Sequence, residues 1–306
     1  MKQTYVNQAR MLMRAAPLVF DDTVALKGGT AINLFITDMP RLSVDIDLTF
    51  VDYRATREAA AASITGSMRA AAERLHAAGF QTFPAEDPEG IEHTLYVEQD
   101  GLRAKIEVNK VIRGTVQPPR AASLVPRARD ILGLDVELAV VSDEDVYGGK
   151  LVAALDRQHP RDLFDIAQLF AGQGLTPAIC RAFVIYLASH NRPIHEVLFA
   201  READITHEYE SSFVGMTDEP FTLQEMLLVR TRLLRELPAA LSHDQRRFLV
   251  SLAEAQPEWS LLDIPHVSEL PAVRWKLQNL QKLAAANPTK LREQRDELVR
   301  RLERLA

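Results

Sequence analysis

The 306-residue sequence is poor in the features that mark secreted, zinc-binding and membrane proteins. It has one cysteine, Cys180, so neither an internal disulfide nor a zinc–cysteine cluster can form. Its histidines show no HExxH or other paired ligand spacing, which argues against a histidine zinc site. No apolar run reaches membrane-spanning length. The first twenty residues are interrupted by Arg10 and Arg14 and predict an amphipathic helix in place of a signal peptide, so we expect a cytoplasmic protein without membrane contact.

Basic residues are fewer than acidic ones, with 36 Lys and Arg against 42 Asp and Glu, so the formal net charge is −6. This balance argues against a protein that coats nucleic acid. The C-terminal stretch Pro271–Ala306 is an exception, with nine Lys or Arg against four acids. It can attract a polyanion, or it can be a solvated helix face with pairs such as Asp296–Arg300.

Hydrophobic periodicity predicts a mixed first half and a helical second half. Strands are expected at 22–27, 43–51, 91–98, 102–112 and 135–141, and helices at 30–36, 55–78, 142–157 and from 160 onward. Strand patterns fade after about Gln173, where helices are expected at 176–189, 223–237, 243–255, 273–286 and 289–305. The polar stretch 201–220 predicts a mobile loop. We therefore expect a catalytic domain at 1–172 and a helical domain for substrate or partner binding at 173–306.

Two carboxylates, Asp45 and Asp47, stand one residue apart within the apolar run VDIDL. On a strand, residues two apart point to the same face, so Ile46 and Leu48 can face the core while both carboxylates share the other face. Like charges held this close repel each other unless a cation lies between them. Carboxylate oxygens are the ligands that Mg²⁺ prefers, so the pattern predicts a metal site. The alternative is a partly exposed strand with two incidental acids.

Two glycines, Gly28 and Gly29, follow a predicted strand and precede a predicted helix. Glycine lets the backbone approach a phosphate closely, and the helix N-terminus together with the Thr30 hydroxyl offers donors to it. Lys27 and Arg41 stand at the two ends of the motif, where cations would meet phosphate charge.

Ser43 is two residues before Asp45, so its hydroxyl shares the carboxylate face and can orient a ligand. Glu107 lies on the polar face of the strand RAKIEVN. If that strand neighbours the first, Glu107 supplies a third carboxylate to a two-metal site. The alternative is an ordinary cross-strand pair with a lysine.

Lys150 lies inside a predicted helix beside the apolar Leu151, and Asp165 follows on the next helix. The residues alone allow two interpretations, a functional cation or a buried Lys150–Asp165 salt bridge. The GGK run that ends at Lys150 is not a P-loop, because Glu144 stands where its first glycine should be and Leu151 replaces Ser or Thr.

Taken in order, LKGGTAINLF, RLSVDIDL, KIEVN and GGKLVAALDRQHPRDLFDIAQL resemble the AbiEii/AbiGii-type nucleotidyltransferase toxins of abortive-infection and type IV toxin–antitoxin systems. The resemblance spans about Ala25 to Leu169, and its order and spacing make it more specific than Asp-x-Asp alone. It implies an α+β fold, in which a nucleotidyltransferase-like mixed sheet flanked by helices precedes an all-helical C-terminal domain.

The resemblance implies Mg²⁺-dependent transfer of a nucleoside monophosphate from an NTP, with Mn²⁺ as the alternative metal. The implied acceptor is RNA, particularly the tRNA 3′ end, whose modification would block translation, and the implied partner is a cognate antitoxin. The implied catalytic residues are Asp45, Asp47, Lys150 and Asp165, with Lys150 on the nucleotide phosphates and Asp165 as the base. Together with the candidates named above, the expected nucleotide-binding residues are Lys27, Gly28, Gly29, Thr30, Arg41, Ser43 and Lys150, and the expected metal ligands are Asp45, Asp47 and Glu107.

Two other functions stay open. The same reaction can modify a protein or a small molecule such as an antibiotic, or the chain can be a nucleotide-binding regulator without turnover. The set Asp45, Asp47, Lys150 and Asp165 argues against a regulator, because binding alone does not require all four.

Overall fold

The computed structural model describes residues 1–305, and the chain divides into two compact units. The first unit contains Met1–Val146 and Val214–Pro220, and the second contains Tyr147–Phe213 and the chain from Phe221 onward. The division falls inside helix α5 (Asp143–Asp156). Helix α6, which the sequence analysis groups with the catalytic domain, belongs by its contacts to the second unit. The functional division at residue 172 stays a prediction.

A seven-stranded mixed sheet in the order β3-β4-β5-β2-β1-β7-β6 is the centre of the first unit. Strand β2 pairs antiparallel with β1 and parallel with β5, and β1 pairs parallel with β7. The two motif-bearing strands are therefore central in the sheet. The strands are β1 (Val24–Lys27), β2 (Asp45–Phe50), β3 (Gln81–Glu86), β4 (Glu92–Gln99), β5 (Leu102–Asn109), β6 (Arg120–Ser123) and β7 (Glu137–Val140).

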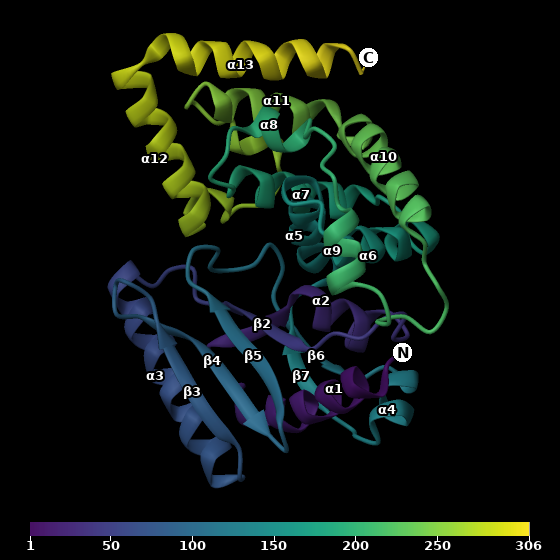
Figure 1. Ribbon diagram of the computed structural model, residues 1–306. Coiled ribbons are helices and arrows are strands. Elements are labelled where there is room, and N and C mark those ends of the chain that lie inside the picture. The colour runs from purple at the N-terminus through teal and green to yellow at the C-terminus, as the bar shows by residue number, and fades with distance from the viewer. Residues whose placement is uncertain (306) are drawn as a thin grey trace. The chain divides into compact units, whose positions relative to one another are not determined.

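Helices α1 (Gln3–Ala15) and α3 (Arg57–Ala77) cover this sheet, with α3 along β3 and β4 and α1 against β5 (Figure 1). Leu95, Val97 and Ile106 point into the core and are fully buried. Alternate residues on the same strands are polar or half-buried, as period-two patterning requires. The mixed sheet flanked by helices is confirmed.

Several elements of the first unit were not expected from the sequence, namely β3, β6, helix α4 (Pro126–Leu132) and the 3₁₀ turn η1 (Ala16–Leu18). The helix expected at 30–36 is one α-helical turn, α2 (Gly28–Ala31), followed by the π-helical segment η2 (Ile32–Ile36). Its wider turn is closed by Thr37 N–H donating to the Ile32 carbonyl at 2.8 Å. Single π-helical turns are rare in proteins, and those that occur are often found at functional sites.

The second unit is all-helical, as expected. Its elements after α5 are α6 (Pro160–Ala171), α7 (Pro177–Ala188), α8 (Ile194–Leu198), α9 (Thr206–Ser212), α10 (Leu223–Ala240), α11 (His243–Ala253), η3 (Trp259–Leu261), η4 (Val267–Glu269), α12 (Pro271–Ala286) and α13 (Pro288–Glu303). Across the described residues, none of the helices combines the length and apolar character needed to span a membrane.

The loop expected at 201–220 contains a helix that the sequence did not predict. Residues 206–212 form α9, and Ile205 and Phe213 beside it are buried, which gives this polar stretch its apolar anchors. Residues 214–220 belong to the first unit, where Leu42 N–H donates to the Met216 carbonyl at 2.9 Å. The N-terminal amine binds Asp218 at 2.8 Å, so this segment is held by both backbone and charge.

Candidate active site

Asp45 and Asp47 lie on one face of β2, as the alternation predicts. Ile46 and Leu48 between and after them are fully buried, whereas both aspartates are only partly buried. Asp47 pairs in register with Lys27 on β1 and with Glu107 on β5. The structure therefore brings the predicted acids and one predicted cation to neighbouring positions in the centre of the sheet.

The glycine turn packs directly against these carboxylates. Gly28 has φ +74°, and a Cβ on it would lie 2.5 Å from Asp47 Oδ2. A Cβ on Gly29 would lie 2.8 Å from Arg41 Nη2 and 3.2 Å from Ser43 Oγ. Only residues without a side chain fit here, so the backbone of the turn lies close to an acidic and a cationic group.

Thr30, Arg41 and Ser43 are buried next to this turn. The Thr30 hydroxyl donates to the carbonyl of Asp45 and lies 2.9 Å from Ser43 Oγ. Arg41 is 2% exposed, and its Nη1 donates to the Leu42 carbonyl at 2.8 Å. The turn therefore packs against a buried guanidinium, a planar group that suits carboxylate and phosphate oxygens.

The cations beside the two aspartates have opposite pKa shifts. Burial lowers the pKa of Lys27, and the charges of Asp47 and Glu107 offset only part of that effect. Burial also lowers the pKa of Lys105, but its hydrogen bond to Glu107 and the charges of Glu107 and Asp47 outweigh this and raise it. The field of the carboxylates is thus strong enough to hold Lys105 charged.

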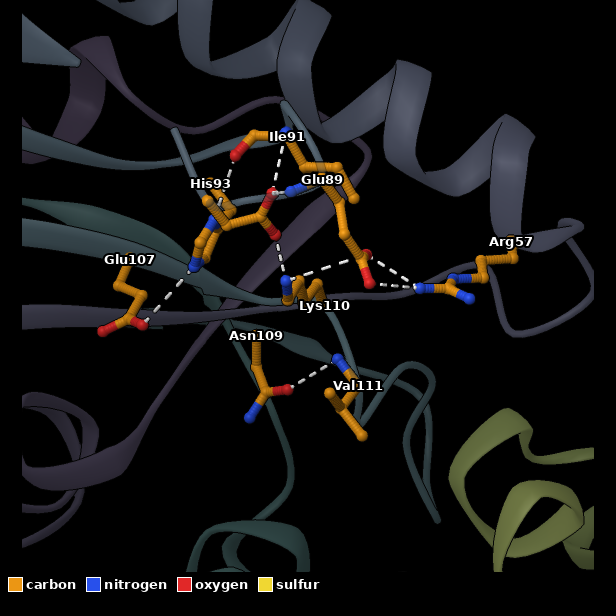
Figure 2. A network of polar contacts seen from close by, with 9 residues as sticks. Arg57, Glu89, Ile91, His93, Glu107, Asn109, Lys110 and Val111 are labelled. Atoms are coloured by element: carbon orange, nitrogen blue, oxygen red, sulfur yellow. Dashed lines mark hydrogen bonds and ion pairs between the residues drawn. The ribbon is translucent and has the colours of Figure 1, made fainter. Parts of the chain in front are cut away.

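Glu107 lies opposite Asp47 in register, but its carboxylate contacts Lys105 and lies 3.9 Å from Nε2 of His93 (Figure 2). Among residues 1–305, no three or more His, Cys, Asp or Glu side chains gather in a way that could hold a metal ion. Lys105 and Glu107 lie two residues apart on β5, so this pair runs along one strand and is not the cross-strand pair weighed from the sequence. The role of Glu107 as a third metal ligand remains a prediction.

A polar network that the sequence analysis missed fixes the tip of the β3–β4 hairpin (Figure 2). The Asp87 carboxylate accepts from the backbone N–H groups of Glu89 and Ile91 at 2.8 and 3.0 Å and pairs with Lys110 after β5. Glu89 in turn binds Arg57 at the start of α3, at 2.7 Å. The hydrogen bond from Lys110 is the largest cause that lowers the pKa of Asp87 to about 2. This network holds the start of β4, and with it His93, beside Glu107.

Lys150 and Asp165 form a buried ion pair in the second unit. Lys150 Nζ lies 3.0 Å from Asp165 Oδ2 and 2.8 Å from Asp162 Oδ1, and the three side chains are 8%, 0% and 1% exposed. Arg157 also binds Asp162, at 2.6 Å. Burial raises the pKa of Asp162, but Lys150 and Arg157 outweigh it and hold that pKa well below the usual range. The salt bridge allowed by the sequence is therefore present, and Asp162, given no part in the site by the sequence analysis, is central to it.

The glycines before Lys150 serve helix packing. A Cβ on Gly148 would lie 2.9 Å from backbone atoms of Ala182, and one on Gly149 would lie 3.5 Å from the ring of Tyr186. Both contacts are with α7, so the small residues let α5 and α7 approach closely. This agrees with the inference that GGK is not a P-loop.

Gly28→Ala is expected to lower turnover by about 10²-fold, because the Asp47 carboxylate must move by roughly 1 Å to admit the methyl group. The left-handed backbone adds a cost of about 1–2 kcal/mol in stability. Steady-state transfer kinetics and thermal unfolding measure the two effects. Gly66→Ala in α3, where a Cβ meets no atom within 4 Å, is the control and should retain full activity. Equal activity of both variants would show that the Gly28–Asp47 contact is unimportant.

Comparison with known proteins identifies the family. Residues 10–279 match the family model described as "Nucleotidyl transferase AbiEii toxin, Type IV TA system". No curated protein matches the sequence. Among solved structures, the chain is similar to MenT4, nucleotidyltransferase toxin Rv2826c from Mycobacterium tuberculosis H37Rv, with a TM-score of 0.59 and 19% identity over 90% of this chain and 92% of that chain. At this identity the likeness shows the fold alone.

The family match covers most of the chain and includes the glycine turn, the β2 aspartates and the Lys150 cluster. Membership implies an NTP substrate, a cognate antitoxin and the divalent metal typical of nucleotidyltransferases. The chain therefore belongs to the AbiEii family, and it is a nucleotidyltransferase toxin of a type IV toxin–antitoxin system.

Proposed function

We propose that this enzyme uses Mg²⁺ to transfer a nucleoside monophosphate from an NTP to RNA, with the tRNA 3′ end as the acceptor. Such a transfer would join the α-phosphate to the 3′ hydroxyl, release pyrophosphate, and so block the hydroxyl to which an amino acid is attached and stop translation. The observation that carries the proposal is the close approach of the Gly28–Gly29 turn to Asp47, Arg41 and Ser43. A phosphate-bearing ligand needs backbone access, cations and a metal-binding acid at one place, and these residues supply all of them.

The donor set of β2 fits Mg²⁺. Asp45 and Asp47 present hard oxygen ligands on one strand face, and the Gly28 backbone packs closely against the Asp47 carboxylate. Asp45 and Asp47 would hold Mg²⁺ there, and the ion would supply positive charge to neutralise the negative charge that develops during transfer.

The protein's own groups bind and orient the nucleotide. Gly28 and Gly29 admit the phosphates to the backbone, and Arg41 and Lys27 balance their charge. Thr30 fixes Ser43 by a hydrogen bond and so sets the position of the hydroxyl on the ligand side.

Lys150 and Asp165 keep the roles that the family resemblance implies, on the phosphates and as a base for the incoming hydroxyl. Their mutual salt bridge, with Lys150 Nζ 3.0 Å from Asp165 Oδ2, fixes the positions of both side chains. An ionised carboxylate is the form required of a base.

The acceptor is tested by incubating the protein with each labelled NTP, Mg²⁺ and total cellular RNA and protein. Label in the tRNA fraction, at the 3′ end after nuclease mapping, is the expected result. Label found only in protein or in small molecules would show that the acceptor is not RNA, while the transfer reaction itself would still be supported. Absence of transfer to any fraction with every NTP would contradict catalysis.

The basic face of α13 is proposed to contact the RNA backbone. Lys290 and Arg292 are exposed, whereas Arg295, Arg300 and Arg301 are engaged in ion pairs with acidic neighbours. Leu298 and Leu302 on the same helix are buried, so deleting α13 would also remove core. Charge reversal at exposed positions is therefore the sharper experiment.

The Lys290→Glu/Arg292→Glu double variant is expected to bind RNA more weakly, because each lost phosphate contact lowers the slope of log affinity against log salt by about 0.7–0.9. The affinity for NTP should not change. Titration of labelled tRNA at several salt concentrations measures the slope. Arg129→Glu/Arg235→Glu removes the same charge from exposed positions outside α13 and is the matched control. Equal slopes for the two double variants would exclude α13 as an RNA contact.

A further inference from the structure

The polar face of the sheet continues from the aspartates across three more strands to the sheet edge. In register, Asp45 on β2 pairs with Lys105 on β5, Lys105 with Tyr96 on β4, and Tyr96 with Phe83 on β3. Since β3, β4 and β5 lie side by side, these residues form one row (Figure 1). Arg103 lies two residues before Lys105 on β5, so its side chain is on the same face of the sheet. We call Phe83, Tyr96, Arg103 and Lys105 the aromatic row.

The aromatic row combines exposed rings with cations. Phe83 is 45% exposed, although burial of a phenylalanine is normally favourable. The Arg103 guanidinium lies over the Tyr96 ring, 4.3 Å from its centroid, and the Arg103 side chain is 56% exposed. Glu98 also holds Arg103, with Oε1 at 3.4 Å from Nη1, so the outer face of the guanidinium is presented in a fixed place.

The spacing of the row suits successive bases. Neighbouring strands lie about 4.8 Å apart, so the Tyr96 backbone is roughly 10 Å from that of Asp45 and the Phe83 backbone roughly 14 Å from it. Bases stack on aromatic rings and on arginine planes. A single nucleotide has one base, whereas two stacking surfaces in line require a chain.

The edge strand disfavours the main alternative, a protein partner that extends the sheet. Pro84 sits in the middle of β3 and has no N–H to donate, so β3 is a poor template for an added strand. Lys105 and Arg103 on β5 instead offer cations to a backbone of phosphates, on a chain whose overall charge is negative.

We propose that the unpaired end of the RNA acceptor lies along the aromatic row, with its bases stacked on the Arg103–Tyr96 pair and on Phe83. This rests on the proposed transfer to RNA, and it assigns the direction in which the acceptor approaches the β2 aspartates. The terminal hydroxyl then lies at the Asp45 end of the row, and the preceding nucleotides lie toward β3.

The kinetic test compares Phe83→Ala and Arg103→Ala with the wild-type protein. Each is expected to raise the KM for RNA by about tenfold, as for the loss of one stacked base, while the KM for NTP and the melting temperature stay unchanged. Arg103→Lys keeps the charge but not the plane, and it should restore less than the full affinity. Leu228→Ala removes an exposed apolar side chain from α10 and should behave as wild type. A rise in the KM for NTP alone would assign the row to the nucleotide and overturn the proposal.

A binding test without turnover separates this proposal from the proposed reaction. Fluorescence anisotropy compares an RNA hairpin that has an unpaired 3′ tail with the same hairpin ending in a blunt pair. The wild-type protein should prefer the tailed hairpin, and Phe83→Ala and Arg103→Ala should lose that preference. A further outcome is that the two variants lose the preference for the tailed hairpin although even the wild-type protein transfers no label to RNA. In that case the aromatic row binds RNA, and the reaction has another acceptor. The proposal would be refuted if both variants kept the preference for the tailed hairpin. It would also be refuted if the substitutions weakened only the binding of the antitoxin.

Discussion

The Asp47→Asn variant is expected to transfer nucleotide at least about 10³-fold more slowly than the wild-type protein, because several kcal/mol of transition-state charge stabilisation depend on the metal. Asparagine has nearly the same volume but lacks the charge that a hard cation requires. Asp47 is only partly buried, and the core beneath it is made by Ile46 and Leu48. The melting temperature should therefore change little, and loss of one of two adjacent like charges relieves their repulsion.

The assay is transfer of label from NTP, with thermal unfolding measured on the same preparation. Asp45→Asn should give the same loss, and excess chelator should abolish activity in the wild-type protein. Asp52→Asn, at an exposed position just after β2, is the matched control and should remain active. Activity that survives in either strand variant, or in chelator, would rule out catalysis by a metal on the two carboxylates.

The Lys150→Met variant is expected to lose about 3–5 kcal/mol of stability, since it leaves two buried carboxylates without their shared cation. For a chain of this size the melting temperature should fall by roughly 10 °C. If Lys150 also stabilises phosphate charge, turnover of the folded protein should fall by about 10²-fold. Both quantities must be measured below the variant's unfolding transition.

Asp162→Asn is the comparison that separates the two roles of the cluster. Asp162 shares Lys150 with Asp165 but also binds Arg157, and no nucleotide role is assigned to it. It should therefore be destabilised like the lysine variant while keeping much more of its turnover. Equal turnover in the two variants would make the cluster purely structural, and unchanged melting temperatures would contradict the buried ion pair itself.

The site on β2 was predictable because its signals are local. The alternation of Asp45 and Asp47 with Ile46 and Leu48 fixes which face is polar without reference to any other strand. The adjacent glycines mark a turn with a left-handed residue, which Gly28 adopts. The contacts of Gly29 with Arg41 and Ser43 depend on how the turn folds back. The sequence could therefore identify these residues as candidates but could not predict that they touch the turn.

Other features depend on partners far apart in the chain. Strand β3 contains a proline and alternates weakly, so its pairing with β4 decides its conformation. The link from Asp87 to Lys110 joins two strand ends across 23 residues. Lys150 meets Asp162 because of how α5 and α6 pack, which no local pattern encodes. Residues 201–220 are polar enough to predict a loop, yet Ile205, Phe213 and Met216 are buried.

The return of residues 214–220 to the first unit has a consequence for synthesis of the toxin. Leu42 and Arg41, next to the glycine turn, pair with Met216 and Thr217, and the N-terminal amine pairs with Asp218. Contacts over such a sequence separation form late during folding. A ribosome must therefore synthesise more than two thirds of the chain before all residues of the first unit are present. Products of premature termination before this segment lack a complete first unit, so the first unit is complete only after residues 147–213 of the helical unit have been made as well.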